Sequence, residues 1–280
     1  MNCSLFRGCA YLAALSVCSA TGMLLKSQTG VFAAGTHHLF LRCEGERRGA
    51  SVILESGDFR DSSDWKKVQP EVARVAQVCS YDRDGLGKST VDGIHDPDAL
   101  GVDDQIRDLK ALLETAGVKP PYVLVGHSMG GIQVRKFGAT FPADVIGMVL
   151  LDSAHEEQNW RFQAIDPSSI AGPPADPVRA RREGLLPTPG ERLTWQTDFP
   201  LIVIEHGRPL TFEGPSAKHA LEFEGVMHEM QIDLASRSSK GQLRTALHSG
   251  HFIMLDEPSV VVQAISDVLH DAGPKNSLGK

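Results

Sequence analysis

Residues 123–131 read Val-Leu-Val-Gly-His-Ser-Met-Gly-Gly, an apolar run that stops at a serine placed between two glycines. The pattern Gly126-x-Ser128-x-Gly130 is typical of a nucleophile elbow, a tight strand-to-helix turn that presents a hydroxyl group. Because the serine of such a turn holds a strained backbone angle, its neighbours must be small, and Gly131 lets the next helix pack close to the sheet. Apolar residues at helical spacing follow, so the context agrees with the motif.

The rest of the chain alternates between short apolar runs and amphipathic stretches. This alternation predicts an α/β fold, a mostly parallel, doubly wound sheet with helices on both faces. Functional sites of such sheets lie at the carboxyl ends of the strands, where Ser128 is expected. We expect strands at residues 38–43, 51–55, 77–81, 120–125, 146–151, 201–205 and 243–248, and helices at 103–116, 128–141 and 260–270.

A chain of 280 residues can bury a full core, which we expect to be one domain built from residues 35–154 and 199–280. Residues 155–198 break the alternation, since they are rich in Pro, Arg and Trp and contain no clear strand. A segment this long between two strands is usually functional. We interpret it as a small helical cap over the site, with a surface excursion away from the site as the alternative.

Residues 1–34 are predicted to be separate from this core. Arg7 precedes an uncharged stretch at 8–25 and Lys26 follows it, the pattern of a signal peptide. The stretch is also long enough for a tilted membrane anchor. We therefore expect a protein that is secreted, periplasmic or membrane-anchored by this segment; a buried first helix is the alternative.

Composition excludes some classes of partner. The net charge of −7, with no basic stripe, disfavours a nucleic-acid or anionic-membrane partner. Three of the five cysteines fall in the predicted leader, which leaves only Cys43 and Cys79 in the core. Two cysteines in so large a domain do not make a disulfide framework, and they lack the C-x-x-C spacing of a zinc or redox site.

A serine hydroxyl needs a base to become a nucleophile, and His251 is the candidate. It lies in Ser249-Gly250-His251-Phe252, a glycine-loosened loop just after the last expected strand. His248 is the rival, but as a strand residue we interpret it as structural. The neighbour of the serine, His127, points in another direction and is expected to pack or hydrogen-bond. Four further histidines have no second ligand at metal spacing, and we interpret them as ordinary: His155, His206, His219 and His228.

Four segments together resemble the α/β-hydrolase family. They are 54–58 (Leu-Glu-Ser-Gly-Asp), 81–89 (Tyr-Asp-Arg-Asp-Gly-Leu-Gly-Lys-Ser), 126–131 and 249–252, and the resemblance spans residues 35–272. The second segment is similar to the family's D-x-x-G-x-G-x-S turn. The resemblance implies a catalytic triad, an oxyanion hole and no metal or organic cofactor. It does not imply a particular substrate, and we expect a small molecule.

The triad acid is where the chain departs from the family's common pattern. Most members carry an aspartate after the strand that is expected here at 201–205, but this chain continues with His206-Gly207-Arg208-Pro209. Some members place the acid one strand earlier, where Asp152 ends an apolar run. We therefore expect Asp152 to be the acid, with Glu205 and then Glu213 as alternatives; otherwise Asp152 caps the following turn.

The oxyanion hole is expected to use backbone N–H groups, which are rigid and already aimed. One would come from Met129, directly after the nucleophile. By the resemblance, Ser56-Gly57 replaces the usual His-Gly, so Asp58 would give the second N–H, with Phe59 as the alternative donor.

The resemblance also places the strands of Cys43 and Cys79 side by side, which leaves a disulfide geometrically open. Export would supply an oxidising compartment. Both cysteines nevertheless end apolar runs, and we expect two buried, unreactive thiols.

The sequence thus predicts an α/β serine hydrolase that cleaves a carboxylic ester of small or medium size through an acyl-enzyme. Ser128 would attack, His251 would shuttle the proton and Asp152 would orient the imidazole ring. Two alternatives stay open. One is acyl transfer or carbon–carbon hydrolysis on the same residues, and the other is a non-catalytic binding protein.

Overall fold

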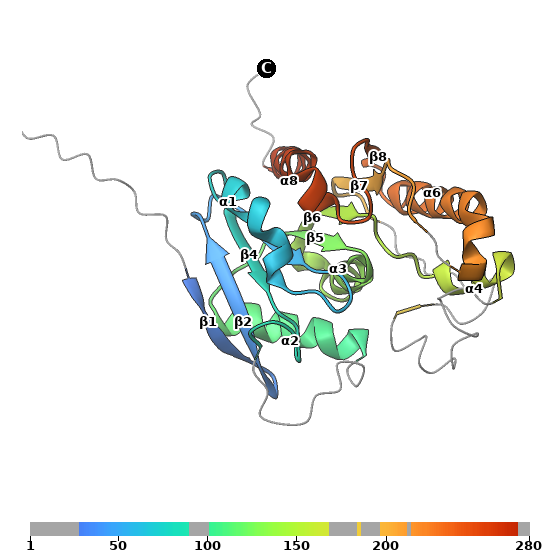
Figure 1. Cartoon of the computed structure of the whole chain (residues 1–280). Helices are drawn as coiled ribbons and strands as arrows, with labels where there is room; N and C mark the ends of the chain where they lie inside the picture. The colour runs from blue at the N-terminus through green and yellow to red at the C-terminus, as the bar shows by residue number, and fades with distance from the viewer. Residues whose placement is uncertain (1–27, 90–100, 168–183, 186–196, 212–213, 274–280) are drawn as a thin grey trace, which may run out of the picture.

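The computed structural model describes residues 28–89, 101–167, 184–185, 197–211 and 214–273 (Figure 1). The strands are β1 (Gln28–Ala34), β2 (His37–Glu44), β3 (Ser51–Glu55), β4 (Gln77–Tyr81), β5 (Tyr122–His127), β6 (Val145–Leu151), β7 (Leu201–His206) and β8 (Gly241–Ala246). The helices are η1 (Ser62–Lys67), α1 (Gln69–Val72), α2 (Val102–Thr115), α3 (Met129–Thr140), η2 (Pro142–Asp144), α4 (Gln158–Ile165), η3 (Gly214–His219), α6 (Ala220–Ser236), α7 (Ile253–Asp256) and α8 (Pro258–Ala272).

The described strands form one eight-stranded sheet in the order β1-β2-β4-β3-β5-β6-β7-β8. The pairs β1–β2 and β2–β4 are antiparallel, and every pair from β4 to β8 is parallel. The mostly parallel, doubly wound sheet predicted from the sequence is therefore confirmed. Strand β5, which leads into Ser128, lies near the centre between β3 and β6.

Both faces of the sheet are covered, because neighbouring residues of each buried strand point to opposite sides. On β5, Leu124 packs into one cluster with α2, α3 and part of α6, whereas Val123 and Val125 pack into the other. This second cluster is closed by η1, α1, α7 and α8. Figure 1 shows α2 and α8 on opposite sides of the sheet. Burial on both faces explains why the central strands read as continuous apolar runs.

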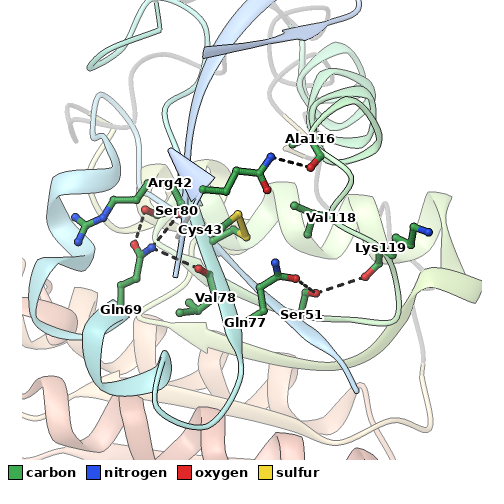
Figure 2. Close-up of a disulfide and its surroundings, with 12 residues drawn as sticks. Arg42, Cys43, Ser51, Gln69, Gln77, Val78, Ser80, Ala116, Val118 and Lys119 are labelled. Atoms are coloured by element: carbon green, nitrogen blue, oxygen red, sulfur yellow. Dashed lines mark hydrogen bonds between the residues drawn. A yellow bond between two sulfur atoms is a disulfide. The ribbon is translucent and has the colours of Figure 1, made fainter. Parts of the chain in front are cut away.

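The expectation of two free thiols is wrong, since Cys43 and Cys79 form a disulfide. They are directly opposite each other on antiparallel strands β2 and β4, with α-carbons 4.0 Å apart, and both are buried. Figure 2 shows the bond and a neighbouring polar bridge: Gln69 donates to the carbonyls of Arg42 and Val78 and so joins the same two strands. The pairing depends on strand register, which apolar runs alone do not specify.

The amino-terminal boundary of the core lies earlier than predicted. Residues 28–34 form β1, an edge strand paired with β2, so the predicted boundary at residue 35 falls inside the first hairpin. The charged and uncharged stretches on which the leader prediction rests lie outside the described residues. Within the described ranges, no helix has both the length and the apolar character needed to span a bilayer.

The predicted cap at 155–198 is described only in part, as residues 155–167, 184–185 and 197–198. It contains α4, which packs against α6, with the rings of Phe162 and Phe223 at 5.3 Å and perpendicular. Figure 1 shows these two helices together, beyond the β7–β8 edge of the sheet. No element is predicted from the sequence at α6, although Phe223, Met230 and Leu234 are buried along it at spacings that fit one helix face.

Candidate active site

The side chains of the predicted site follow parallel strands whose ends lie at one edge of the sheet. The register pairs Glu55 of β3 with Gly126 of β5, and His127 of β5 with Leu151 of β6. The residues just beyond these strands, Ser56, Ser128 and Asp152, therefore come together although they are far apart in sequence.

Ser128 occupies the strained turn that its motif predicts. Its backbone has φ 53° and ψ −126°, a conformation rare for a residue with a side chain. The turn is held by backbone hydrogen bonds, since the Ser128 N–H donates to Leu151 (3.0 Å) and its carbonyl accepts from Gly131 and Ala154 (both 2.9 Å). A Cβ at Gly126 would lie 2.6 Å from Val134 Cγ2, so only glycine fits there.

His251 and Asp152 are brought together from the loop after β8 and the end of β6. His251 Nδ1 lies 2.5 Å from Asp152 Oδ2, and the carboxylate is fully buried. Burial alone would raise the pKa of Asp152, but hydrogen bonds from His206 and His251 outweigh it and lower the pKa to about 2. The carboxylate is thus ionised and accepts the Nδ1 proton, which leaves Nε2 of a neutral His251 as the nitrogen that can take a proton.

A second histidine, which the sequence analysis interpreted as ordinary, contacts the same carboxylate. His206, the last residue of β7, has its Nδ1 2.6 Å from Asp152 Oδ1. Its Nε2 lies 2.9 Å from Glu224 Oε2 on α6. Its position is a signal that could have identified it, because His206 follows the expected strand at 201–205, after which most family members carry the acid.

The alternative acids are engaged elsewhere or lie outside the description. Glu205 points to the neighbouring elements, where its Oε2 lies 2.7 Å from His228 Nδ1 and its Oε1 accepts from Thr245 (2.9 Å). Glu213 is outside the described residues. Of the two candidate carboxylates with described positions, Asp152 is the one that contacts His251.

His127, next to the nucleophile, holds the loop that carries His251. Its Nε2 lies 2.9 Å from the His251 carbonyl, and because a carbonyl only accepts, Nε2 carries the proton. Burial and the neighbouring charge of His251 lower the pKa of His127 to about 4, so the ring is neutral at pH 7. The two rings are 4.6 Å apart, and this contact couples β5 to the loop after β8.

The loop after β3 is fixed by a buried arginine that the sequence analysis quoted without assigning a role. Arg83 donates to the Ser56 carbonyl (2.7 Å), to the Gly57 carbonyl (2.6 Å) and to Glu55 (2.5 Å). In a trans peptide the C=O and the following N–H point in opposite directions. Since the Gly57 carbonyl points to Arg83, the Asp58 N–H points away from Arg83.

This loop also lies against the nucleophile. A Cβ at Gly57 would be 3.2 Å from Ser128 Cβ, and one at Gly130 would be 2.5 Å from the Ser56 carbonyl oxygen. The Met129 N–H opens helix α3, and the first N–H groups of a helix have no partner within the helix. The oxyanion roles of the Met129 and Asp58 N–H groups stay predictions.

A buried ion network supports the segment after Asp152. Arg135 of α3 donates to Ser153 Oγ (2.7 Å), to the Ala154 carbonyl (3.0 Å) and to Glu156 (2.9 Å), which also accepts from Arg237 (3.1 Å). The network ties α3 and the end of α6 to the strand end that carries Asp152. Among the residues with described positions, no group of three or more His, Cys, Asp or Glu could hold a metal ion.

The sequence profile of the alpha/beta hydrolase fold matches residues 51–185, which include the β3 loop, the serine turn and Asp152. The chain belongs to the α/β-hydrolase family. Within this α/β-hydrolase, the D-x-x-G-x-G-x-S segment has a structural role. The Asp82 carboxylate accepts from the backbone N–H groups of Ser62 and Lys88 (both 2.7 Å) and thereby closes the turn after β4.

Known proteins similar to this α/β-hydrolase cover most of its length. The uncharacterized protein YqjL of Bacillus subtilis is 29% identical over 224 residues, which are 79% of this chain and 83% of that protein. The proline iminopeptidase-related protein of Thermus thermophilus has a TM-score of 0.63 at 18% identity, covering 89% of this chain and 99% of that one. A thermophilic esterase from Thermogutta terrifontis has a TM-score of 0.59 at 18% identity, covering 88% and 100%. These structural likenesses show the fold.

Proposed function

We propose that this α/β-hydrolase is a serine esterase that cleaves small or medium carboxylic esters through an acyl-enzyme. The observation that carries the proposal is the hydrogen bond between His251 Nδ1 and buried Asp152 (2.5 Å), at the sheet edge where Ser128 holds its strained turn. A serine hydroxyl becomes a nucleophile when an imidazole that a carboxylate orients takes its proton.

In the proposed reaction, Ser128 Oγ attacks the ester carbonyl carbon and His251 Nε2 takes the hydroxyl proton. Ionised Asp152 stabilises the imidazolium that forms and keeps its Nδ1 directed inward. The N–H groups of Met129 and Asp58 stabilise the negative oxygen of the tetrahedral intermediate. His251 then protonates the departing alcohol, and water attacks the acyl-enzyme by the reverse sequence.

The Asp58 side chain could oppose this chemistry, because a carboxylate repels a developing oxyanion. The turn geometry supports the donor role of its backbone instead. The Arg60 N–H donates to the Gly57 carbonyl (3.3 Å), and Phe59 has φ 54°, so residues 57–60 form a tight turn. The arginine clamp on the Gly57 carbonyl fixes the direction of the Asp58 N–H.

Hydrolysis of p-nitrophenyl esters of graded acyl length tests the proposal. Wild-type protein is expected to release p-nitrophenol and to be labelled covalently by a fluorophosphonate. Ser128→Ala is expected to lose both while it keeps the wild-type circular dichroism spectrum. Labelling that persists in Ser128→Ala, or a wild-type protein that neither turns over nor labels, overturns the proposal.

We also propose that the protein is exported. The leader pattern at residues 1–34 and the Cys43–Cys79 disulfide support this, because disulfides persist in oxidising compartments and are rare in the cytosol. The full chain, expressed in a bacterial host, is expected in a membrane or extracytoplasmic fraction with Cys43 and Cys79 oxidised. A full chain recovered from the cytosol with both thiols free contradicts export.

A further inference from the structure

The triad acid of the proposed site is shared by two histidines. Asp152 Oδ2 contacts His251 Nδ1 at 2.5 Å, and Asp152 Oδ1 contacts His206 Nδ1 at 2.6 Å. The backbone N–H of His206 also points to Oδ1, at 3.4 Å. The chemistry assigned to the triad uses only the first of these contacts, so the second has no assigned role.

Both ring nitrogens of His206 face carboxylates. Beyond Asp152 on one side, its Nε2 lies 2.9 Å from Glu224 Oε2, and the other oxygen of Glu224 accepts from the Leu210 N–H at 2.8 Å. An ionised carboxylate only accepts hydrogen bonds, so each nitrogen of His206 must donate. A histidine that donates from both nitrogens is an imidazolium.

The surroundings of His206 support this charge. Its side chain is nearly buried, at 6% exposure, and burial alone would disfavour the charged ring. Hydrogen bonds and charges of Asp152 and Glu224 outweigh that effect and raise the pKa of His206 to about 9. Glu224, His206, Asp152 and His251 therefore form a row of successive contacts, in which the charges of the first three alternate in sign.

We propose that His206 is a positioning residue of the active site, whose imidazolium fixes the Asp152 carboxylate for His251 and limits the basicity of His251. The inference rests on the proposed esterase function, because it assigns a role within the same triad. A cation on the far side of Asp152 stabilises the carboxylate and disfavours a second positive charge on His251.

Other charged groups near this row are paired with one another. Arg208, two residues beyond His206, contacts Asp256 of α7 at 2.7 Å. The titratable and charged groups around His206 and His251 come from β5, β6, β7 and its following loop, α6, and α7: His127, Asp152, Glu205, Arg208, Glu224, His228 and Asp256.

Two variants separate charge from shape. His206→Asn keeps a neutral amide donor near the position of Nδ1 but removes the cation. Without that cation His251 binds a proton more readily, so the acidic limb of kcat/KM should move up by about half to one pH unit. Glu224→Gln removes the carboxylate that offsets His206, so the limb should move down, by less, because Glu224 lies one residue further from His251 in the row.

His228→Asn is the matched control. His228 lies on α6 and pairs with Glu205 at 2.7 Å, so it is the same kind of histidine–carboxylate contact between the same two elements. It does not contact Asp152 in the described hydrogen bonds. In His228→Asn, the acidic limb of the kcat/KM profile is expected to stay at the wild-type pH.

NMR titration of the His251 ring in wild type and both variants gives a readout that needs no turnover. Opposite displacements of the His251 pKa in His206→Asn and Glu224→Gln support the inference, even where ester hydrolysis is absent and the proposed function fails. Equal pKa values in all three proteins overturn it. So do displacements in one direction only, or a loss of kcat in His206→Asn with an unmoved pH profile, because these indicate a purely structural role.

Discussion

Asp152 has an unusual setting for a single residue. It follows β6 with φ 39°, a left-handed conformation that few non-glycine residues adopt, and its N–H donates to the Ile204 carbonyl at 2.7 Å. The conformation turns the carboxylate toward the ends of β7 and β8, where the histidines lie. Backbone strain at this position is consistent with a functional constraint rather than with capping of the next turn.

Replacement of the two carboxylates that compete for the acid role tests this assignment. Asp152→Asn is expected to lower kcat by about 10⁴-fold, because an amide cannot stabilise the His251 imidazolium and favours the wrong tautomer. Glu205→Gln, whose side chain contacts His228 and Thr245, is expected to stay within about threefold of wild type. Steady-state hydrolysis of one p-nitrophenyl ester measures both. Wild-type activity in Asp152→Asn, together with an inactive Glu205→Gln, would assign the acid role to Glu205 on β7.

At the scale of elements, the site depends on how closely α3 approaches the loop after β3. Gly130, in the first turn of α3, faces the Ser56 carbonyl, and a Cβ there would lie 2.5 Å from that oxygen and 2.9 Å from the Glu55 carbonyl oxygen. Both neighbours are backbone atoms, and the Ser56 carbonyl accepts a hydrogen bond from Arg83, so they cannot move aside easily. A side chain at Gly130 must therefore separate the helix from the loop.

Gly130→Ala is expected to lower the free energy of unfolding by about 1–3 kcal/mol, the usual cost of overpacking, and to lower kcat/KM as the Asp58 N–H shifts. Gly225→Ala is the matched control, because Gly225 is also helical but a Cβ there meets nothing within 4 Å. Since alanine favours a helix over glycine, Gly225→Ala should be about 0.5–1 kcal/mol more stable and equally active. Urea unfolding measures both variants. Equal stability of Gly130→Ala and wild type would contradict the close packing.

At the scale of the whole molecule, the disulfide closes a loop between two strands of the antiparallel edge. Cys43 and Cys79 are separated by 36 residues in sequence. In the chain-entropy view, a loop of this size restricts the unfolded chain by about 4 kcal/mol. The bond lies on β2 and β4, away from the parallel strands that carry the triad, so it is expected to affect stability more than catalysis.

The double variant Cys43→Ala/Cys79→Ala should be about 2–4 kcal/mol less stable than oxidised wild type, while kcat per folded molecule is unchanged. Denaturant unfolding and active-site titration check the two parts. Alkylation without a reductant should leave Cys43 and Cys79 of the wild-type protein unmodified, and alkylation after reduction should modify both. Wild-type protein that is fully alkylated without a reductant would contradict the bond.

The charge on His206 also predicts a pH dependence of global stability. A histidine whose pKa is raised on folding contributes stability that is present below its unfolded value of about 6.5 and is lost as the pH rises through about 9. The difference in free energy of unfolding between wild type and His206→Asn should therefore shrink across that window, by up to about 1.4 kcal/mol per pH unit. Urea unfolding at pH 6 and pH 9 tests this, and a constant difference would contradict it.

Local patterns predicted the parts of the fold that local physics controls. The strands at 51–55 and 77–81 have the predicted bounds, because buried β-branched and aliphatic runs end at turn residues there. The serine turn follows from a glycine spacing within five residues, and the sheet edge that carries Ser128 follows from the alternation of strands and helices. Helix α6 was not predicted, since its buried residues are sparse on a long, charged surface.

Taken alone, the amino-acid sequence determined the α/β class, the strained serine turn and a short set of candidate partners, because these depend on residue type and near-neighbour spacing. Only the tertiary structure decided which candidates meet. Asp152 and His251 are 99 residues apart, and His206 is 54 from Asp152, so their contacts depend on strand order and register. The same holds for Cys43 and Cys79, which face each other because β2 and β4 align residue by residue. Register is set by the packing of the whole sheet, and a shift of one residue in a strand would turn its side chains to the other face.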